Sequence, residues 1–394
     1  TTIWVKNIVF QAPDLVRVNG RNILLLDGVL AVKSGRRMPG VKTLHQSSAS
    51  PNTPTFPLGH QFQALVVLIG SLAHAVAIPL AARIHQGIEL TPLGKKTLLD
   101  RALKLIQSLN LPPSYLVADA YYSSGRLLQG LLHHGHHMIT RIKHNSVAYM
   151  KVLPSEKRGR GRPRLFGDKV HLRDLFAMRQ DFSSATIDMY GQPSQVSYLS
   201  VDLICRSFGD LVRYVFVVLP DGRQSILMTT DLCCNPVDVI RLYSLRFKIE
   251  GFFRQTKQRM GTFFYHFWTQ AVEKTTRSCT KKTLYLHRMS KRRRSSVLAT
   301  KKAYEVFVQA AMIAQGLMLL LAHYFPGEVW SEFKGWMRSI RADLSPSEAI
   351  VQEALSRSLS RYFFKQRMNV AWLKLLAENL DIERAGSLVF AQTG

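Results

Sequence analysis

Residues 22–35, NILLLDGVLAVKSG, form an apolar run whose only acidic side chain, Asp27, lies near its middle. A short apolar run of this kind predicts a strand in the centre of a sheet, buried on both faces. A buried carboxylate is costly unless it is paired or binds a cation. Asp27 is therefore a candidate metal ligand, and a capping or hydrogen-bonded turn role is the ordinary alternative.

A second aspartate, Asp119, ends the strand-like run at the start of YLVADAYYSSG, residues 115–125. The run stops just before a predicted turn and a new helix. Asp119 is a metal-ligand candidate for the same reason as Asp27. The capping alternative is stronger here, because aspartate is common at helix starts.

The stretch 235–261 predicts a single long helix, one face of which sets a single carboxylate, Glu250, among cations. Asn235 suits the N-cap, and Gly261 suits the residue past the end. At roughly 100° per residue, one face gathers five side chains. They are Tyr243, Arg246, Glu250, Lys257 and, close beside this arc, Arg254. An acid among cations that can bind phosphates suggests metal-assisted phosphoryl transfer. The ordinary alternative is a charged helix face exposed to solvent.

Glu250 lies within the pattern Tyr-x2-Arg-x3-Glu-x6-Lys at 243–257, behind the two strand aspartates. In this order the chain resembles the DDE transposases of bacterial insertion sequences that carry the Tyr-Arg-Glu-Lys signature. The likeness includes 27–48, 58–65 and the run around Asp119, and it covers about residues 20–270. It implies an α/β fold with a ribonuclease H-like core, in which the two aspartates lie on neighbouring strands and Glu250 arrives from a later helix.

The resemblance also implies a chemistry. Asp27, Asp119 and Glu250 would hold two Mg²⁺ or Mn²⁺ ions, since hard carboxylate oxygens suit hard cations. Such ions promote in-line displacement at a phosphodiester. The expected activity is cleavage and strand transfer at insertion-sequence ends, of the cut-and-paste type, with a homodimer on the DNA ends.

The charge of the chain supports a polyanionic partner. Its 53 Lys and Arg against 26 Asp and Glu give a formal charge of +27. Double-stranded DNA is the expected partner, bound with strong salt dependence. We expect no membrane partner, because the nearest apolar run, 306–325, contains Gln309, Gln315 and His323 and predicts a buried helix.

Further DNA-binding candidates lie outside the helix. They are Lys33, Arg36, Arg37 and Lys42 after Asp27, Arg160 and Arg162 in an Arg-Gly-Arg-Pro core, and Trp268 in YHFW. The Arg-Gly-Arg-Pro core resembles a minor-groove AT-hook, with a disordered loop contacting phosphates as the alternative. Trp268 is suited to stacking on an unpaired base, and packing beneath the helix is the alternative.

We expect four parts, namely 1–146 as the first part of the catalytic core, 147–234 as a β-rich insertion, 235–272 as the Glu250 helix, and 273–394 as a basic segment and helical C-terminal region. In the first part, strands are predicted near 3–10, 15–33, 62–85, 115–119 and 137–143, and helices near 94–109 and 124–134. A Pro-Asp-Gly turn at 220–222 predicts a hairpin in the insertion. The C-terminal helices are predicted near 303–325, 328–340, 346–359 and 365–380.

Four cysteines show neither CxxC spacing nor a disulfide framework, which suits a reducing cytoplasm and argues against structural zinc. The resemblance to transposases implies a bacterial cytoplasm, with the protein at the nucleoid. The HHGHH cluster at 133–137 predicts a surface loop, and neither it nor His45 or His60 receives a role. The chain opens at Thr1 and reaches Asp27 early, so we expect most of the family's N-terminal DNA-binding region to be missing.

Three alternatives stay open. Another ribonuclease H-like nuclease or a resolvase would use the same metal chemistry. A catalytically inactive, transposase-derived DNA-binding protein would keep the charge without the reaction. A structural basic protein would explain the charge and leave the acids unexplained.

Overall fold

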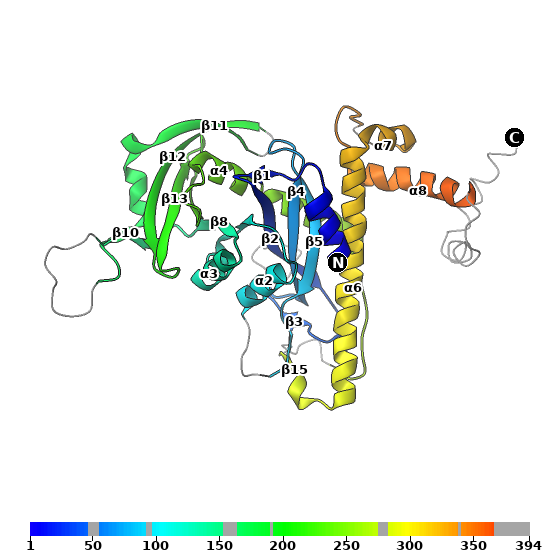
Figure 1. Ribbon diagram of the computed structural model, residues 1–394. Helices are drawn as coiled ribbons and strands as arrows, with labels where there is room; N and C mark the ends of the chain where they lie inside the picture. Colours follow the sequence, from blue (N-terminus) through cyan, green and yellow to red (C-terminus); the bar gives the residue numbers. More distant parts are fainter. Residues whose placement is uncertain are drawn as a thin grey trace. The chain divides into compact units, whose positions relative to one another are not determined.

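The computed structural model describes residues 1–45, 55–91, 97–152, 164–189, 192–274, 283–337 and 340–365. The chain divides into two units, Thr1–Gly316 and Leu317–Gly394. The first contains a large mixed sheet flanked by helices, and the described part of the second is helical (Figure 1). The expected α/β class, with a mixed sheet and a helical C-terminal region, is confirmed.

The apolar run around Asp27 forms β2 (Arg21–Val32), in the middle of the sheet. One neighbour is β4 (Leu58–Ile69), which runs antiparallel to it, and the other is β7 (Ser114–Ala118), which runs parallel. Strand β8 (His137–Ile142) lies parallel to β7, and β5 (Val76–Ile84) lies antiparallel to β4. Residues 23–26 of β2 are at most 1% exposed, so apolar side chains on both faces hold this strand inside.

The predicted β-rich segment extends this same sheet. Its strands are β9 (Val147–Tyr149), β10 (Lys169–His171), β11 (Ser183–Met189), β12 (Gln192–Cys205), β13 (Asp210–Val218) and β14 (Gln224–Thr229). Strand β14 pairs with β8, so the insertion and the core share one hydrogen-bonded ladder. The predicted hairpin at 220–222 is confirmed, because β13 and β14 pair antiparallel and the Leu219 N–H donates to the Arg223 carbonyl at 2.9 Å.

Helices cover the two faces of the sheet differently. Helices α2 (Leu98–Gln107) and α3 (Gly125–His133) lie together on the face toward the viewer in Figure 1. Helices α4 (Pro236–Ser244) and α5 (Phe247–Gln258) share a core with Ile23, Leu25 and Val29 of β2. Side chains alternate along a strand. Asp27, at the same parity as these three residues, therefore faces α4 and α5.

The outer edge of β5 is covered by α6 (Lys291–Tyr324). The Gln309 side chain accepts from the Ala82 N–H at 3.3 Å and donates to the Leu80 carbonyl at 3.1 Å. Glu305 accepts from the Ile84 N–H at 3.3 Å. These side chains satisfy backbone groups that an open sheet edge would expose to other chains.

By length and composition, α6 is the one helix among the described residues that could cross a membrane. Its first part has the contacts of a core helix. Val308 and Met312 belong to the main core, and the buried Gln315 accepts a hydrogen bond from the Thr256 hydroxyl at 2.6 Å. These contacts bury one face of the helix, but Val306, Phe307 and Leu317 are 57%, 38% and 51% exposed, so the prediction of a buried helix over 306–325 holds only in part.

The remaining elements are short, except for one helix of 18 residues. They are β3 (Lys42–Thr43), β6 (Ile88–Glu89), β15 (Leu284–Tyr285), α7 (Pro326–Glu332), α8 (Glu348–Lys365) and the 3-10 helices Ala120–Tyr122, Leu172–Ala177, Arg179–Asp181 and Leu286–Arg288. The predicted helix at 328–340 is shorter than expected, since α7 ends at Glu332. Nearly all of the helix predicted at 365–380 lies outside the described residues.

Three predicted strands were wrong in type or extent. Residues 3–10 are helical, as α1 (Thr2–Lys6) and a π-helical turn (Asn7–Gln11), because Val5, Ile8 and Val9 are buried at helical spacing. The predicted strand 15–33 is a hairpin of β1 (Arg17–Val18) and β2, turned at 19–20, where both residues have positive φ. The predicted strand 62–85 is the pair β4 and β5.

Candidate active site

Strand register sets Asp27 beside Asp119. In the parallel ladder of β2 and β7, Leu25 lies opposite Val117. The ladder ends at this pair, and Asp27 and Asp119 each lie two residues beyond it, close enough for the charge of Asp119 to raise the pKa of Asp27. Asp119 also caps the following 3-10 turn, where its carboxylate accepts from the Tyr121 N–H at 3.0 Å. The capping alternative and the shared location therefore both hold for Asp119.

The carboxylate of Asp27 is held at a free-energy cost. Its pKa is raised from 3.8 to about 6, chiefly by burial. The Gly28 N–H, which donates to it at 2.7 Å, and Arg246 lower the pKa, whereas Asp119 and Glu250 raise it. Two further acids thus lie close enough to act on Asp27, and such a cluster favours the binding of a cation.

Arg246 joins the helix to the strand. Its guanidinium contacts the Asp27 carboxylate at 3.2 Å and also forms an ion pair with Glu250. The Arg246 side chain is 21% exposed, and that of Glu250 is 54% exposed. The guanidinium thus bridges an inner and an outer acid, and it brings Glu250, far along the chain, next to Asp27.

The single helix predicted over 235–261 is wrong, because the chain breaks into α4 and α5 at Leu245–Arg246. Hydrogen bonds between residues three positions apart replace the α-helical pattern there. The Lys248 N–H donates to the Leu245 carbonyl at 3.0 Å, and the Ile249 N–H donates to the Arg246 carbonyl at 3.2 Å. A 3-10 turn advances about 120° per residue instead of 100°. Arg246 therefore turns inward to the acids, while Arg254 and Lys257 are exposed further along α5.

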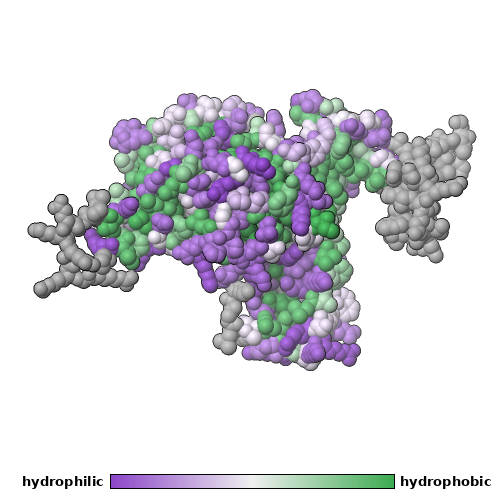
Figure 2. Space-filling model, viewed as in Figure 1, coloured by the Kyte–Doolittle hydropathy of each residue, from purple (hydrophilic) through white to green (hydrophobic). Residues whose placement is uncertain are grey.

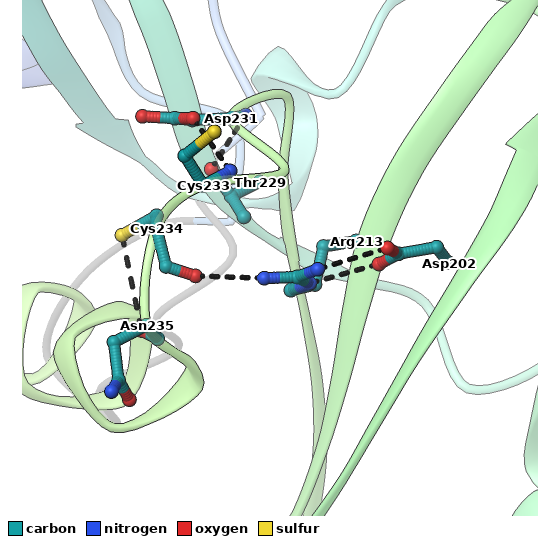
Figure 3. A network of polar contacts seen from close by, with 7 residues as sticks. All are labelled: Asp202, Arg213, Thr229, Asp231, Cys233, Cys234 and Asn235. Carbon is teal, nitrogen blue, oxygen red and sulfur yellow. Dashed lines mark hydrogen bonds and ion pairs between the residues drawn. The ribbon is translucent and has the colours of Figure 1, made fainter.

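A polar network anchors the start of α4 (Figure 3). Arg213 on β13 donates two hydrogen bonds to Asp202 on β12, at 2.8 and 2.9 Å, and a third to the Cys234 carbonyl at 3.1 Å. Asn235 then caps the helix by accepting from the Val237 N–H at 2.9 Å, as predicted. The network fixes to the sheet the segment that leads to Arg246 and Glu250.

The assignment of Lys33 to DNA phosphates was wrong. Its side chain is 5% exposed, and the ammonium donates to the backbone carbonyls of Phe263 and Tyr265, the latter at 2.8 Å. Burial lowers the pKa of Lys33 to about 8. His60 holds the same segment, with its ring 2.6 Å from the Tyr265 hydroxyl and 2.9 Å from the Pro39 carbonyl. Both residues fasten the chain that follows α5.

Three other predicted DNA-binding residues, Arg36, Arg37 and Trp268, line one pocket. Trp268 is 60% exposed, so it does not pack beneath the helix. His266 and Lys274 line the same pocket and were not singled out, although they lie within two noted sequence features, the YHFW motif and the basic segment after it. Arg160 and Arg162 lie outside the described residues.

From Lys291 onward, the predicted basic segment forms the start of α6. Lys291, Arg292 and Arg293 are exposed there, and Figure 2 shows hydrophilic side chains at this end of the helix, low in the view. The guanidinium of Arg293 also donates to the Ala271 carbonyl at 2.9 Å. This surface has the charge that phosphate contacts require.

The three acids are of the right kind for a divalent cation, since all their donor atoms are carboxylate oxygens. In the part of the chain that the structure describes, no three His, Cys, Asp or Glu side chains are close enough to form a complete ligand set. Arg246 lies between two of the acids. A cation bound there would take over the charge balance that this guanidinium supplies.

The family model described as "DDE superfamily endonuclease" matches residues 4–185, which include Asp27 and Asp119 but not Glu250. No curated protein matches the chain. Among solved structures, the chain is similar to the piggyBac transposase in a synaptic complex with hairpin DNA, with a TM-score of 0.37 and 11% identity over 91% of this chain and 57% of that one. The chain thus spans little more than half the length of that protein.

Proposed function

We propose that this chain is a DNA transposase of the DDE type, which cleaves phosphodiester bonds and joins DNA strands. The observation that carries the proposal is that Asp119, which follows β7, and Glu250 on α5 both lie close enough to raise the pKa of Asp27, with Arg246 paired to Asp27 and Glu250. The family match over the first two acids and the charge of +27 support it.

Asp27, Asp119 and Glu250 would hold the metal, most simply two Mg²⁺ or Mn²⁺ ions. When bound, such ions activate the attacking hydroxyl and stabilise the leaving oxygen at a phosphodiester. Arg246 keeps Asp27 and Glu250 together until DNA arrives. Arg254 and Lys257, exposed on α5, and Tyr243 on α4 position the DNA backbone near the acids.

The biological setting is part of the proposal. The resemblance to transposases with the Tyr-Arg-Glu-Lys signature supports cut-and-paste movement of a bacterial insertion sequence, with a homodimer at the paired DNA ends. Such a protein acts at the nucleoid, in the cytoplasm.

One observation favours a second candidate, a DNA-binding protein that has lost catalysis. Arg246 fills the position between Asp27 and Glu250, and the described residues contain no complete metal-ligand set. In this alternative the guanidinium is the permanent partner of the two acids. DNA binding would then persist without cleavage.

The test measures nicking of supercoiled plasmid DNA, and binding to the same DNA, by the full chain with Mg²⁺ or Mn²⁺ and with EDTA. Glu250→Gln should abolish nicking and largely spare binding. Lys257→Ala should weaken binding and reduce its salt slope by about one. Lys104→Ala, which removes an exposed lysine of α2, is the matched control and should change neither.

Nicking that survives in Glu250→Gln, or that is undiminished by EDTA, would refute the proposed site. DNA binding by the unmodified chain without any metal-dependent nicking would favour the second candidate.

A further inference from the structure

A pocket of about 490 Å³ lies between two segments that continue the elements of the acids. One wall is the loop that follows β2, with Arg36 and Arg37 above Met38. The other follows α5 and contributes Trp268 and Lys274. This volume is in the range of small-molecule sites and accommodates a nucleotide.

The walls of the pocket are fixed before any ligand binds. The Thr269 N–H donates to the Arg37 carbonyl at 3.2 Å and so ties one wall to the other. The Thr269 hydroxyl lies 2.6 Å from that of Ser296 on α6. Lys33, buried at the end of β2, holds the Phe263 and Tyr265 carbonyls. A site held in this way loses little conformational freedom on binding.

The chemistry of the lining is cationic and aromatic together. None of its side chains is acidic. Within the residues that the structure describes, neither Arg37 nor Lys274 forms an ion pair with a carboxylate. The indole of Trp268 is 60% exposed. A simple inorganic anion would leave the indole without a contact, and a purely apolar ligand would leave the cations without a partner.

We propose that this pocket binds one unpaired nucleotide of a DNA strand, with its base stacked on Trp268 and its phosphates held by Arg36, Arg37 and Lys274. Nucleotides combine a flat aromatic ring with an anion, and protein sites for single strands combine aromatic platforms with cations. The identity of the ligand as DNA rests on the proposed function. The loop begins where β2, the strand of Asp27, ends.

The experiment titrates the full chain with a short oligothymidylate in EDTA and follows tryptophan fluorescence. Trp268→Ala should weaken binding by about 5-fold to more than 100-fold and remove most of the quenching. Trp268→Phe should restore much of the affinity. Trp336→Ala, which removes a tryptophan that is 85% exposed in the second unit, should bind as the unmodified chain does.

Two further arms test the ligand class. Arg37→Ala and Lys274→Ala should each lower the salt slope of single-strand binding by about 0.7. Thymidine 5′-monophosphate should compete with the oligonucleotide far better than inorganic phosphate does. Equal competition by phosphate, or undiminished binding by Trp268→Ala, overturns the proposal. Because the assay contains no metal, Trp268-dependent binding without plasmid nicking would refute the transposase activity and leave the pocket standing.

Discussion

Replacing Asp27 by Asn should stabilise the protein at neutral and alkaline pH, because the fold holds this carboxylate at a cost. Its pKa in the folded chain is about 6, against 3.8 ordinarily. Between these values the folded state binds more protons than the unfolded state. The free energy of unfolding therefore falls as pH rises through this window.

The structure sets the size of the effect. The gap between about 6 and 3.8, at about 1.36 kcal/mol for each pKa unit, corresponds to about 3 kcal/mol. The Asp27 side chain is 21% exposed, so solvent screens part of this cost. We expect the stability of Asp27→Asn relative to the unmodified chain to rise by about 1–3 kcal/mol between about pH 4 and about pH 8.

Urea denaturation of both proteins at the two pH values measures this change, and groups common to both proteins cancel in the comparison. The control is Asp221→Asn. Hydrogen bonds from Arg223 lower the pKa of Asp221 from 3.8, so its effect on stability appears only below about pH 4, and the relative stability of this variant should stay nearly constant over the same pH rise. Added Mn²⁺ should narrow the gap between Asp27→Asn and the unmodified chain at the higher pH, because a cation stabilises the ionised acid. A relative stability of Asp27→Asn that is flat, or that falls with pH, would refute the electrostatic reasoning.

Two further predictions concern buried polar side chains. Gln309→Leu should lower the free energy of unfolding by about 1–3 kcal/mol, because it leaves two backbone groups of β5 unpaired. The control Gln352→Leu, on the exposed surface, should change the free energy of unfolding by less than about 0.5 kcal/mol. Equal urea midpoints for the two variants would contradict this prediction. The lowered pKa of Lys33 means that the unfolded state binds more protons than the folded state between about pH 8 and about pH 10.5. The unmodified chain should therefore gain stability relative to Lys33→Met as pH rises through that window. A difference in stability that does not change with pH would contradict this prediction.

Sequence patterns correctly predicted those parts of the fold that depend on residues close together in the chain. The apolar run around Asp27 was placed in a central strand because both of its faces are apolar. The turn at 220–222 and the cap at Asn235 were predicted because their residue types favour one backbone geometry. Each of these features is decided by a few neighbours in sequence, and each is present in the structure.

The missed features depend on partners far along the chain. Lys33 was expected to be exposed, as lysine usually is, but two carbonyls at 263 and 265 give its ammonium a buried partner. The helix breaks at Leu245–Arg246, and neither position is a glycine or a proline that would have indicated a break from the sequence. Arg246 pairs there with Asp27, on the sheet beneath the helices. Tertiary contacts outweigh helical periodicity at that position.

The surrounding structure restrains the three acids to different degrees, and this difference decides the order in which they could bind a cation. Asp27 lies in β2 and Asp119 directly follows β7, and the buried ladder of these two strands cannot shift without moving the core. Glu250 is more than half exposed and is tied to the pair through Arg246. An exposed ion pair contributes only about 0–1 kcal/mol. Releasing Glu250 from Arg246 therefore costs little beside separating the two aspartates. A cation entering the site would bind first to the preformed pair, and Glu250 would join it by exchanging one positive partner for another.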